Sequence, residues 1–313
     1  MSATTGLPMV HSRSGMPTRI TVYEVGPRDG LQNEAAQVPT DVKVEFITRL
    51  LGAGLGTVEV TSFVPEQWVP QLGDAEAVMA ALGSAAIGLD RPVLVPNERG
   101  LDRALAAGAR SVAIFGSATE SFSQRNLNRS VAQSLAMFAP VVSRALDAGA
   151  WVRGYVSMCF GDPWEGPVPI TQVVDACSAL MDLGCDQLSI GDTIGVATPG
   201  HVVTLIEALG DAGIEPDQIG VHFHDTYGQA LANTMAALSC GVSVVDASAG
   251  GLGGCPYAKS ATGNLATEDL IWALAGMGIE HGVDLAALAA TSVWMAGHLG
   301  RPSPSRVVRA LSG

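Results

Sequence analysis

Two histidines separated by one residue, His222 and His224, are the side chains in this sequence best placed to do chemistry. They lie in a short apolar segment, and residues two apart on a strand point to the same side of it. Both imidazoles can therefore face one metal ion. A carboxylate such as that of Asp29, which follows an earlier strand candidate, could complete the site with a hard oxygen ligand. The alternative is a pair of structural histidines with no ligand.

Short apolar runs that alternate with alanine-rich stretches must position these residues. The strand candidates are residues 19–24, 57–61, 91–95, 111–115, 151–157, 187–190, 219–222 and 243–247. Helices are predicted over 41–53, 75–82, 130–148, 171–183, 200–212 and 227–240. Several of these stretches end in Ala-Gly or Leu-Gly, which is typical of a helix C-terminus. A unit of about thirty residues, repeated eight times, predicts an α/β fold of the (β/α)8 or TIM-barrel type.

The remaining segments fit a single catalytic domain. Helical patterns at 269–278 and 285–299 follow the last strand and predict a short C-terminal helical extension. We expect residues 1–17 to be disordered, with a targeting segment as the alternative, and residues 18–313 to form the barrel with its C-terminal helices. A doubly wound open sheet is the competing fold. It would usually place a glycine-rich phosphate turn after its first strand, where this chain has Arg28-Asp29.

The barrel would bring polar residues from distant segments to one mouth, because active sites of such barrels lie at the carboxyl ends of the strands. Strand ends and the loops after them hold Arg28, Asp29, Glu59, Ser62, Ser189, Thr193, His222 and His224. A glycine-rich loop, 250–264, follows the last strand. Each residue alone could be a polar group that caps a helix, but their joint placement predicts one active site.

Composition excludes several classes of partner. The net charge of −13 argues against nonspecific binding to nucleic acid or to anionic membranes, since both need a basic surface. No apolar run approaches the roughly 20 residues that span a bilayer. The five cysteines are scattered along a large chain, which indicates reduced thiols in a cytoplasmic protein rather than a disulfide framework.

Five motifs, in order, resemble the 3-hydroxy-3-methylglutaryl-CoA lyase family, a branch of the metal-dependent lyase and synthase barrels. They read VYEVGPRDGLQNE, EVTSFVPEQWVPQLGD, SIGDTIGVATPG, HFHDTYGQALANT and GLGGCPYAKSATGNLATEDL. The similarity runs from about residue 21 to residue 310. The synthase relatives share the early Arg-Asp and the His-x-His, whereas the loop that carries Cys255 points to the lyase branch.

The resemblance implies a divalent cation bound by Asp29, His222, His224 and Asn264. This mixed nitrogen and oxygen set suits Mg²⁺ or Mn²⁺, with Zn²⁺ or Co²⁺ as alternatives. Taken alone, Asn264 would be read as the N-cap of the following helix. The implied partner is an acyl-CoA substrate, and we also expect a homodimer or higher homo-oligomer.

The implied reaction is the cleavage of 3-hydroxy-3-methylglutaryl-CoA to acetyl-CoA and acetoacetate, a step of leucine degradation and ketone body metabolism. The resemblance gives catalytic roles to Arg28, Asp29, Glu59, His222 and Cys255. It places Arg28, Ser62, Asn126, Ser189 and Thr193 near the substrate. Cys255 would act as base on the hydroxyl or as the acid that reprotonates the enolate, with His222 as the second candidate. Glu24 and Asp192, and less strongly Arg153, are expected to orient these groups.

The sequence departs from the family in two places that could alter the acyl or CoA preference. Ala35 stands where a lysine is usual, and Asp162-Pro163-Trp164 replaces a Cys-Pro-Tyr string. A sister lyase for a longer 3-hydroxy-3-alkylglutaryl-CoA is therefore one alternative, and a Claisen-type synthase is another. A metal-binding barrel without catalytic activity is the alternative from a different class.

Overall fold

The computed structural model describes residues 7–254 and 263–312. Its single sheet contains nine parallel strand segments in the order β2-β1-β9-β8-β7-β6-β5-β4-β3. The strands are β1 (Thr21–Glu24), β2 (Thr57–Val58), β3 (Thr61–Ser62), β4 (Val93–Leu94), β5 (Ser111–Ser117), β6 (Trp151–Ser157), β7 (Gln187–Asp192), β8 (Ile219–Phe223) and β9 (Val244–Ala247).

The two edges of this sheet belong to one piece of chain, so the sheet is a closed barrel of eight strands. β2 and β3 are the two halves of the predicted strand 57–61, separated by only two residues. The amide of Glu59 donates to the Glu24 carbonyl in β1, at 2.9 Å. The amide of Val60, one residue later, donates to the Pro92 carbonyl on the β4 side, at 3.0 Å. The predicted (β/α)8 barrel is confirmed, and the doubly wound open sheet is excluded.

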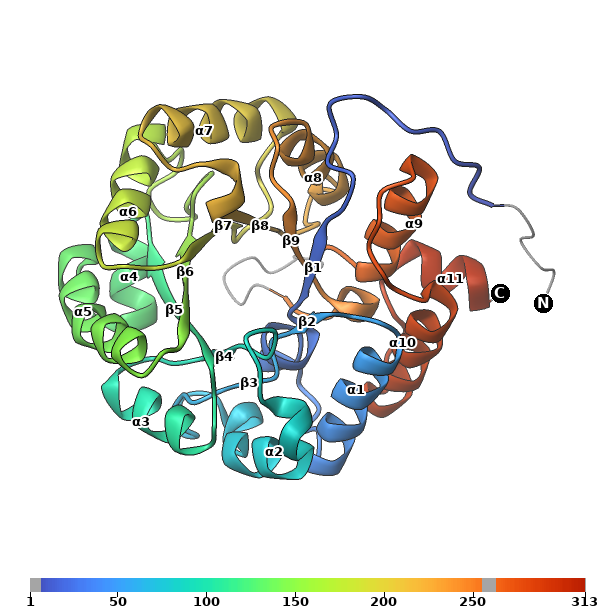
Figure 1. Cartoon of the computed structure of the whole chain (residues 1–313), viewed down its shortest axis with the longest axis horizontal. Helices are drawn as coiled ribbons and strands as arrows, with labels where there is room; N and C mark the ends of the chain where they lie inside the picture. The colour runs from blue at the N-terminus through green and yellow to red at the C-terminus, as the bar shows by residue number, and fades with distance from the viewer. Residues whose placement is uncertain (1–6, 255–262, 313) are drawn as a thin grey trace.

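Helices surround the barrel as an outer ring (Figure 1). They are α1 (Thr40–Gly52), α2 (Ala75–Leu82), α3 (Glu98–Ala106), α4 (Glu120–Leu127), α5 (Val131–Asp147), α6 (Ile170–Asp182), α7 (Pro199–Asp211) and α8 (Ala230–Ser239). The predicted helices lie within a few residues of these bounds, while α3 and α4 are additional. Helix α4 stands beside the barrel mouth, on the long connection from β5 to β6.

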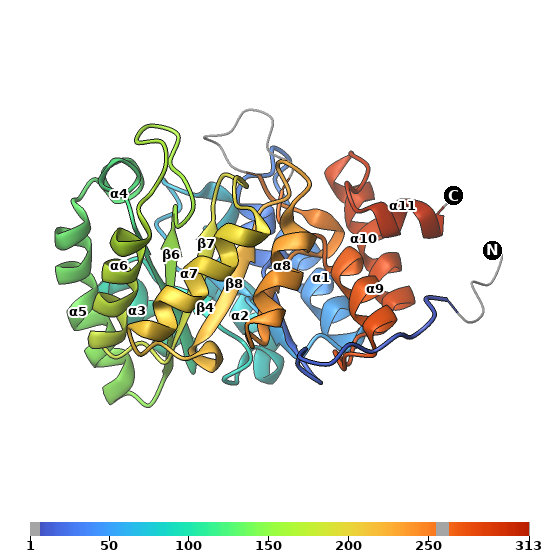
Figure 2. The ribbon, with the colours of Figure 1, turned by 90° about the horizontal axis from the view of Figure 1, so that it is seen from above.

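The predicted C-terminal extension consists of α9 (Thr267–Met277), α10 (Leu285–Leu299) and a further short helix, α11 (Arg306–Ser312). These helices gather on one side of the barrel (Figure 2). Helix α10 packs on α1, where the Arg49 guanidinium lies 4.6 Å from the centre of the Trp294 ring. Residues 7–17 form no helix or strand but lie against the end of α9, and the amide of His11 donates to the Gly276 carbonyl at 2.8 Å.

The interior of the barrel is unusually polar beneath its mouth. Arg153, on β6, is fully buried and forms a 2.8 Å ion pair with Asp246 on β9. Its guanidinium also stacks on the Tyr23 ring at 3.9 Å. Because the Arg153 cation and the Asp246 carboxylate neutralise each other, the pair can remain buried and can orient the side chains nearer the mouth.

Within the described residues, no helix has both the length and the apolar content needed to cross a membrane.

Candidate metal centre and active site

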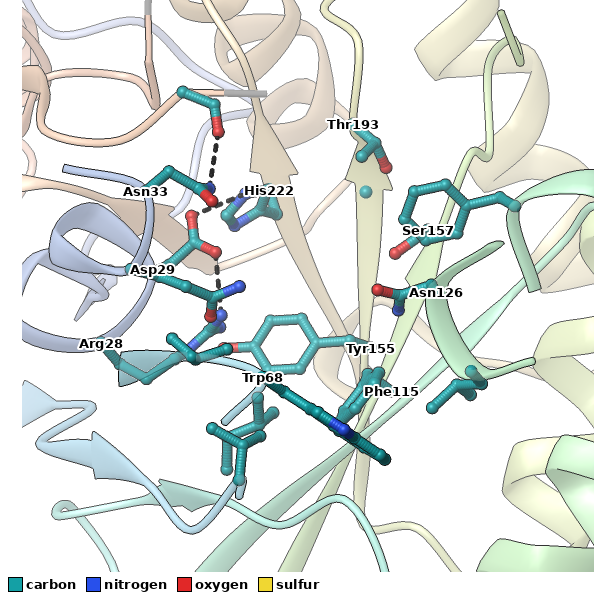
Figure 3. A pocket seen from close by; sticks show the side chains of 18 of the residues that line it. Arg28, Asp29, Asn33, Trp68, Phe115, Asn126, Tyr155, Ser157, Thr193 and His222 are labelled. Carbon is teal, nitrogen blue, oxygen red and sulfur yellow. Dashed lines mark hydrogen bonds and ion pairs between the residues drawn. The ribbon is translucent and has the colours of Figure 1, made fainter. Parts of the chain in front are cut away.

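Three side chains from distant parts of the chain meet at the mouth of the barrel. Asp29 lies on the Gly26–Gly30 turn after β1, His222 is on β8, and His224 directly follows β8. Their candidate ligand atoms all lie within 4.8 Å of one another. The Nε2 atoms of His222 and His224 are 3.2 Å apart, and Nε2 of His222 is 3.9 Å from Oδ2 of Asp29. Figure 3 shows Asp29 and His222 facing each other across the site.

Asn264 completes this group from the loop that precedes α9. Its amide nitrogen donates to Oδ2 of Asp29 at 2.8 Å. Its amide oxygen is buried and has no hydrogen-bond partner among the described residues. Since a buried polar atom without a partner is costly, this oxygen is available to a ligand. The N-cap position of α9 is occupied by Ala266, so the helix-cap reading of Asn264 is wrong.

The geometry of these four residues fits a divalent cation. Two nitrogens bound to one ion at about 2.0–2.1 Å each would themselves be roughly 3 Å apart, as the two Nε2 atoms are. A carboxylate, an amide oxygen and two imidazoles form an acceptable donor set for several divalent ions. The residues therefore fit the cation that the sequence predicts, without distinguishing which metal is bound.

The protonation states of His224 and Asp29 also suit metal binding, which needs neutral imidazole and ionised carboxylate. Burial and the neighbouring His222 lower the pKa of His224 to about 4, so its ring is neutral near pH 7. Burial alone would raise the pKa of Asp29, but Arg28 and then His222 outweigh it and bring this pKa to about 2. For His222, burial lowers the pKa, but the hydrogen bond with Asp246 and the nearby Asp29 carboxylate produce a net rise.

Asp246 is the central support of the metal-binding group, and no motif in the sequence indicates it. Its carboxylate is fully buried and accepts from Arg153 at 2.8 Å and from the Ser189 hydroxyl at 3.0 Å. Nδ1 of His222 lies 3.2 Å from its Oδ2. Because an ionised carboxylate can only accept, Nδ1 carries the proton, which leaves Nε2 of His222 to face the ion. The only sequence signal was a carboxylate on the last predicted strand.

Replacing Asp246 with asparagine should lower the affinity for Mn²⁺ by about 10–100-fold, the usual effect of losing a group that orients a metal-binding histidine. The amide has nearly the same shape but cannot hold both Arg153 and His222 as an anion does. Titration of the metal-free protein with Mn²⁺, followed by electron paramagnetic resonance, measures this. Ser189→Ala is the control that keeps Arg153 and His222 as partners of Asp246 and should lose less affinity. Unchanged Mn²⁺ affinity in a folded Asp246→Asn protein would refute the assignment.

A second charged group lies beside the metal ligands. The Nε of Arg28 donates to Oε2 of Glu59 at 2.7 Å, and its Nη1 donates to Oδ1 of Asp29 at 2.8 Å. The Tyr155 hydroxyl donates to the same Glu59 oxygen at 3.2 Å. Arg28 is only 6% exposed and Glu59 is fully buried, so the guanidinium is held rigidly at the pocket surface. Tyr155 was missed because it lies inside a strand and belongs to no motif.

A cavity of about 440 Å³ lies over these residues and contains most of the predicted site. Its lining includes Arg28, Asp29, Asn126, Thr193, His222 and His224. Asn126 and Thr193 lie across the cavity from Arg28 and Asp29 (Figure 3). Such a pocket has the size of a small-molecule site. Gly254 also lines it, and the Asn33 side chain donates to the Gly254 carbonyl at 3.0 Å. Cys255 itself falls outside the described residues.

Three of the predicted residues, Glu59, Ser62 and Ser189, are not part of the cavity wall, and neither is the candidate ligand Asn264. All three are fully buried below it. Ser189 supports Asp246, Glu59 supports Arg28, and the Ser62 hydroxyl has no partner among the described residues. Ser62 and Ser189 therefore lie behind the cavity lining, and their contact with the substrate stays a prediction. Strand-end position alone did not distinguish the wall from the layer behind it.

Glu24 and Asp192 hold loops rather than metal ligands. Glu24 accepts from the amides of Gly26 and Ala249, both at 2.8 Å, and so joins the turn that carries Arg28 to the loop after β9. Asp192 accepts from the amides of Val196 at 2.9 Å and Ala197 at 3.0 Å. Burial raises the pKa of Glu24 to about 7 and that of Asp192 to about 6, in spite of these hydrogen bonds.

One of the two sequence departures reaches the rim of the cavity. The Trp164 ring lies under the Arg125 guanidinium, 4.2 Å from it, and Arg125 lines the cavity. The loop is closed by paired hydrogen bonds between Asp162 and Gly166, at 2.9 and 2.8 Å. The replacement of a tyrosine by Trp164 thus acts at the entrance, away from the metal ligands.

Comparison with known proteins gives a consistent result. Residues 19–294 match the model of a family described as HMGL-like. The chain is 51% identical over 298 residues to the mitochondrial hydroxymethylglutaryl-CoA lyase of Arabidopsis thaliana, covering 95% of this chain and 63% of the relative. It thus spans less than two thirds of that relative.

Two solved structures are similar over nearly their whole length. The crystal structure of hydroxymethylglutaryl-CoA lyase from Pseudomonas aeruginosa has a TM-score of 0.91 at 43% identity, covering 95% of this chain and 99% of that one. An HMG-CoA lyase from Acinetobacter baumannii, in complex with coenzyme A and 3-methylmalate, has a TM-score of 0.88 at 34% identity, covering 96% and 97%.

Proposed function

The chain belongs to the HMGL-like family, and from this membership we propose that it is a metal-dependent carbon–carbon lyase that cleaves 3-hydroxy-3-methylglutaryl-CoA to acetyl-CoA and acetoacetate. The observation that carries the proposal is the convergence of Asp29, His222 and His224 with the buried Arg28 at one cavity. A metal site beside a fixed guanidinium suits a substrate that carries a carboxylate and develops negative charge.

In this proposal Mg²⁺ or Mn²⁺ is held by Asp29, His222, His224 and Asn264. When bound, the cation would polarise the substrate hydroxyl and fix its orientation, which are the Lewis-acid and template roles of a metal. The neutral His224 and the ionised Asp29 are ready to bind it near pH 7.

The side chains around the cation would carry out the proton transfers, stabilise the enolate and orient the acyl group. A base removes the hydroxyl proton, the carbon–carbon bond breaks, and its electron pair passes to the thioester as an enolate. Arg28, held by Glu59, would donate to the thioester oxygen as this charge develops. Asn126 and Thr193, on the opposite wall, would orient the acyl group. Addition of a proton to the enolate carbon then gives acetyl-CoA.

We assign the proton-transfer role to Cys255, with His222 as the second candidate. The basis is the family motif, since Cys255 lies outside the described residues. Neighbouring Gly254 lines the cavity, which places the start of this loop at the site.

Replacing Cys255 with serine should lower kcat by about a hundredfold, the usual contribution of an acid–base group, because a hydroxyl barely ionises near pH 8. Metal content should stay unchanged, as measured by elemental analysis. Cys240→Ser is the control, since Cys240 lies at the end of α8, away from the cavity. Full turnover by the Cys255→Ser protein would transfer the role to His222.

A panel of thioesters tests the proposed function as a whole. The metal-loaded protein is incubated with 3-hydroxy-3-methylglutaryl-CoA, with longer 3-hydroxy-3-alkylglutaryl-CoA esters, and with acetyl-CoA plus a 2-oxo acid, and products are identified by mass. Acetoacetate from the first substrate supports the proposal. Preference for a longer ester would identify the chain as a sister lyase. Condensation of acetyl-CoA with the 2-oxo acid would identify it as a synthase. No reaction with any substrate would indicate a noncatalytic metal-binding barrel.

We further propose a cytoplasmic homodimer or higher homo-oligomer. The five scattered cysteines, which are typical of reduced thiols, support the cytoplasmic location, while the Arabidopsis relative is mitochondrial by name.

A further inference from the structure

One wall of the cavity is formed by an irregular segment rather than by a strand or a long helix. Residues 63–73 connect β3 to α2 and contribute Val64, Trp68, Val69 and Pro70 to the lining. Trp68 is 60% exposed, so packing against the core cannot fix this segment at its tip. Its helical content is a single 3-10 turn, Pro70–Leu72. We call residues 63–73 the wall segment.

Gln71 ties the wall segment to a second loop of the mouth. This side chain is only 2% exposed. Its oxygen accepts from the amide of Val38 at 3.1 Å, and its nitrogen donates to the carbonyl of Ala36 at 3.0 Å. Its amide group therefore bridges the wall segment and the loop that begins with Gln32 and Asn33, through one accepted and one donated hydrogen bond. Gln32 and Asn33 both line the cavity.

Lys43 ties the same segment to helix α1. Its ammonium group is buried, donates to the Gln71 carbonyl, and forms a 2.7 Å ion pair with Asp74 just past the segment. Thr40 donates to the other oxygen of Asp74, also at 2.7 Å. A buried lysine needs such partners to remain charged at an acceptable cost. Contacts of this kind restrict the wall segment at its base, next to the residues that line the cavity.

We propose that Gln71 and Lys43 are positioning residues that hold the wall segment in place to receive the pantetheine part of the acyl-CoA. This inference rests on the proposed function. The charged end of the pocket is occupied by Arg28 and the metal ligands, so the acyl group belongs there. We take the tail to leave past Val64, Trp68 and Val69, because Trp68 is exposed whereas the apolar residues of the other walls are buried or half-buried. A loop that is fixed before the substrate arrives loses less conformational entropy on binding.

The test compares two thioesters of the same acyl group. For Gln71→Met, which keeps the length of the side chain but removes both hydrogen bonds, KM for 3-hydroxy-3-methylglutaryl-CoA should rise about tenfold with kcat within twofold of wild type. The N-acetylcysteamine thioester lacks most of the tail, so its kinetic constants should be unchanged. Lys43→Met should act in the same direction. An equal loss with both thioesters, or no loss with either, would overturn the proposal.

Gln133→Met is the matched control, since it makes the same chemical change at the capping box of α5, away from the cavity. It should leave both thioesters unaffected. Hydrogen exchange gives a readout independent of activity: amides of residues 63–73 and 36–38 should exchange faster in Gln71→Met while β6 and β7 stay protected.

If the wild-type protein cleaves neither thioester, the proposed function fails, and calorimetric titration with coenzyme A decides the inference separately. Tenfold weaker binding to Gln71→Met supports it. Equal binding, or no binding to the wild type, overturns it.

Discussion

Replacement of His224 with alanine should abolish cleavage and lower the affinity for Mn²⁺ or Mg²⁺ by more than a hundredfold. The ring contributes one of two nitrogens whose Nε2 atoms lie 3.2 Å apart and face the Asp29 carboxylate. Without it, the site keeps only one imidazole for any cation. Because its lowered pKa already makes His224 neutral, raising the pH from about 5 to 8 should not rescue the loss.

The fold should survive this substitution. Nδ1 of His224 has no hydrogen-bond partner among the described residues, so alanine removes no strong contact apart from the one with His222. Circular dichroism should therefore match wild type, while elemental analysis after dialysis shows less bound metal. His298→Ala, at the exposed end of α10, is the control. Chelation of the wild-type protein should reproduce the His224→Ala result, with recovery on addition of Mg²⁺ or Mn²⁺. Full activity in a verified metal-free sample would exclude the proposed role of the metal.

The repeating pattern of the sequence was sufficient to predict the barrel. Strand β6 and helices α2 and α10 have the predicted bounds, because their apolar runs begin and end at clear polar or glycine boundaries. The predicted strand 57–61 is divided, since Glu59 and Val60 bond to different neighbours while the sheet closes there. Closure itself could not be read from the sequence, since it depends on pairing between the ends of the sheet.

The candidate metal ligands were predictable because motifs contain them. The residues that hold the site in place were not predictable. The structure brings Asp29, His222 and His224 together as expected. Asp246 and Tyr155, by contrast, are isolated polar residues inside strands. Their importance lies in contacts across the barrel, 24 residues away for the pair of His222 with Asp246 and 96 for the pair of Tyr155 with Glu59. Sequence spacing carries no information on such pairs.

Arg28→Gln should lower kcat by about a thousandfold and change KM little. The guanidinium is held by Glu59 and Asp29 before any substrate arrives, so its contact with the thioester oxygen should strengthen only as the enolate forms. Interactions made in the transition state alone appear in kcat rather than in KM. Loss of one such preorganised donor costs about 3–4 kcal/mol. Arg28→Lys should recover little, because an ammonium group cannot contact Glu59, Asp29 and the substrate with the planar geometry of arginine.

Because Arg28 and Glu59 form a buried ion pair, the kinetic result needs a control for protein stability. Glu59 is fully buried and the Arg28 side chain is only 8% exposed, and breaking a buried ion pair by removing one partner costs about 3–5 kcal/mol of stability. Burial already raises the pKa of Glu59, and Arg28 is the main opposing influence. The double variant Arg28→Gln/Glu59→Gln removes both charges together and should regain stability.

The double variant should not regain kcat, since the missing donor to the thioester oxygen is still absent. Steady-state kinetics beside thermal unfolding therefore separates catalysis from folding. Metal affinity should stay within a fewfold of wild type, because the cation depends on Asp29 and the imidazoles. Recovery of kcat in the double variant would mean that Arg28 only compensates a buried carboxylate. A rise in KM alone would make Arg28 a simple binding group, and the proposed stabilisation of the enolate would then have to come from the cation.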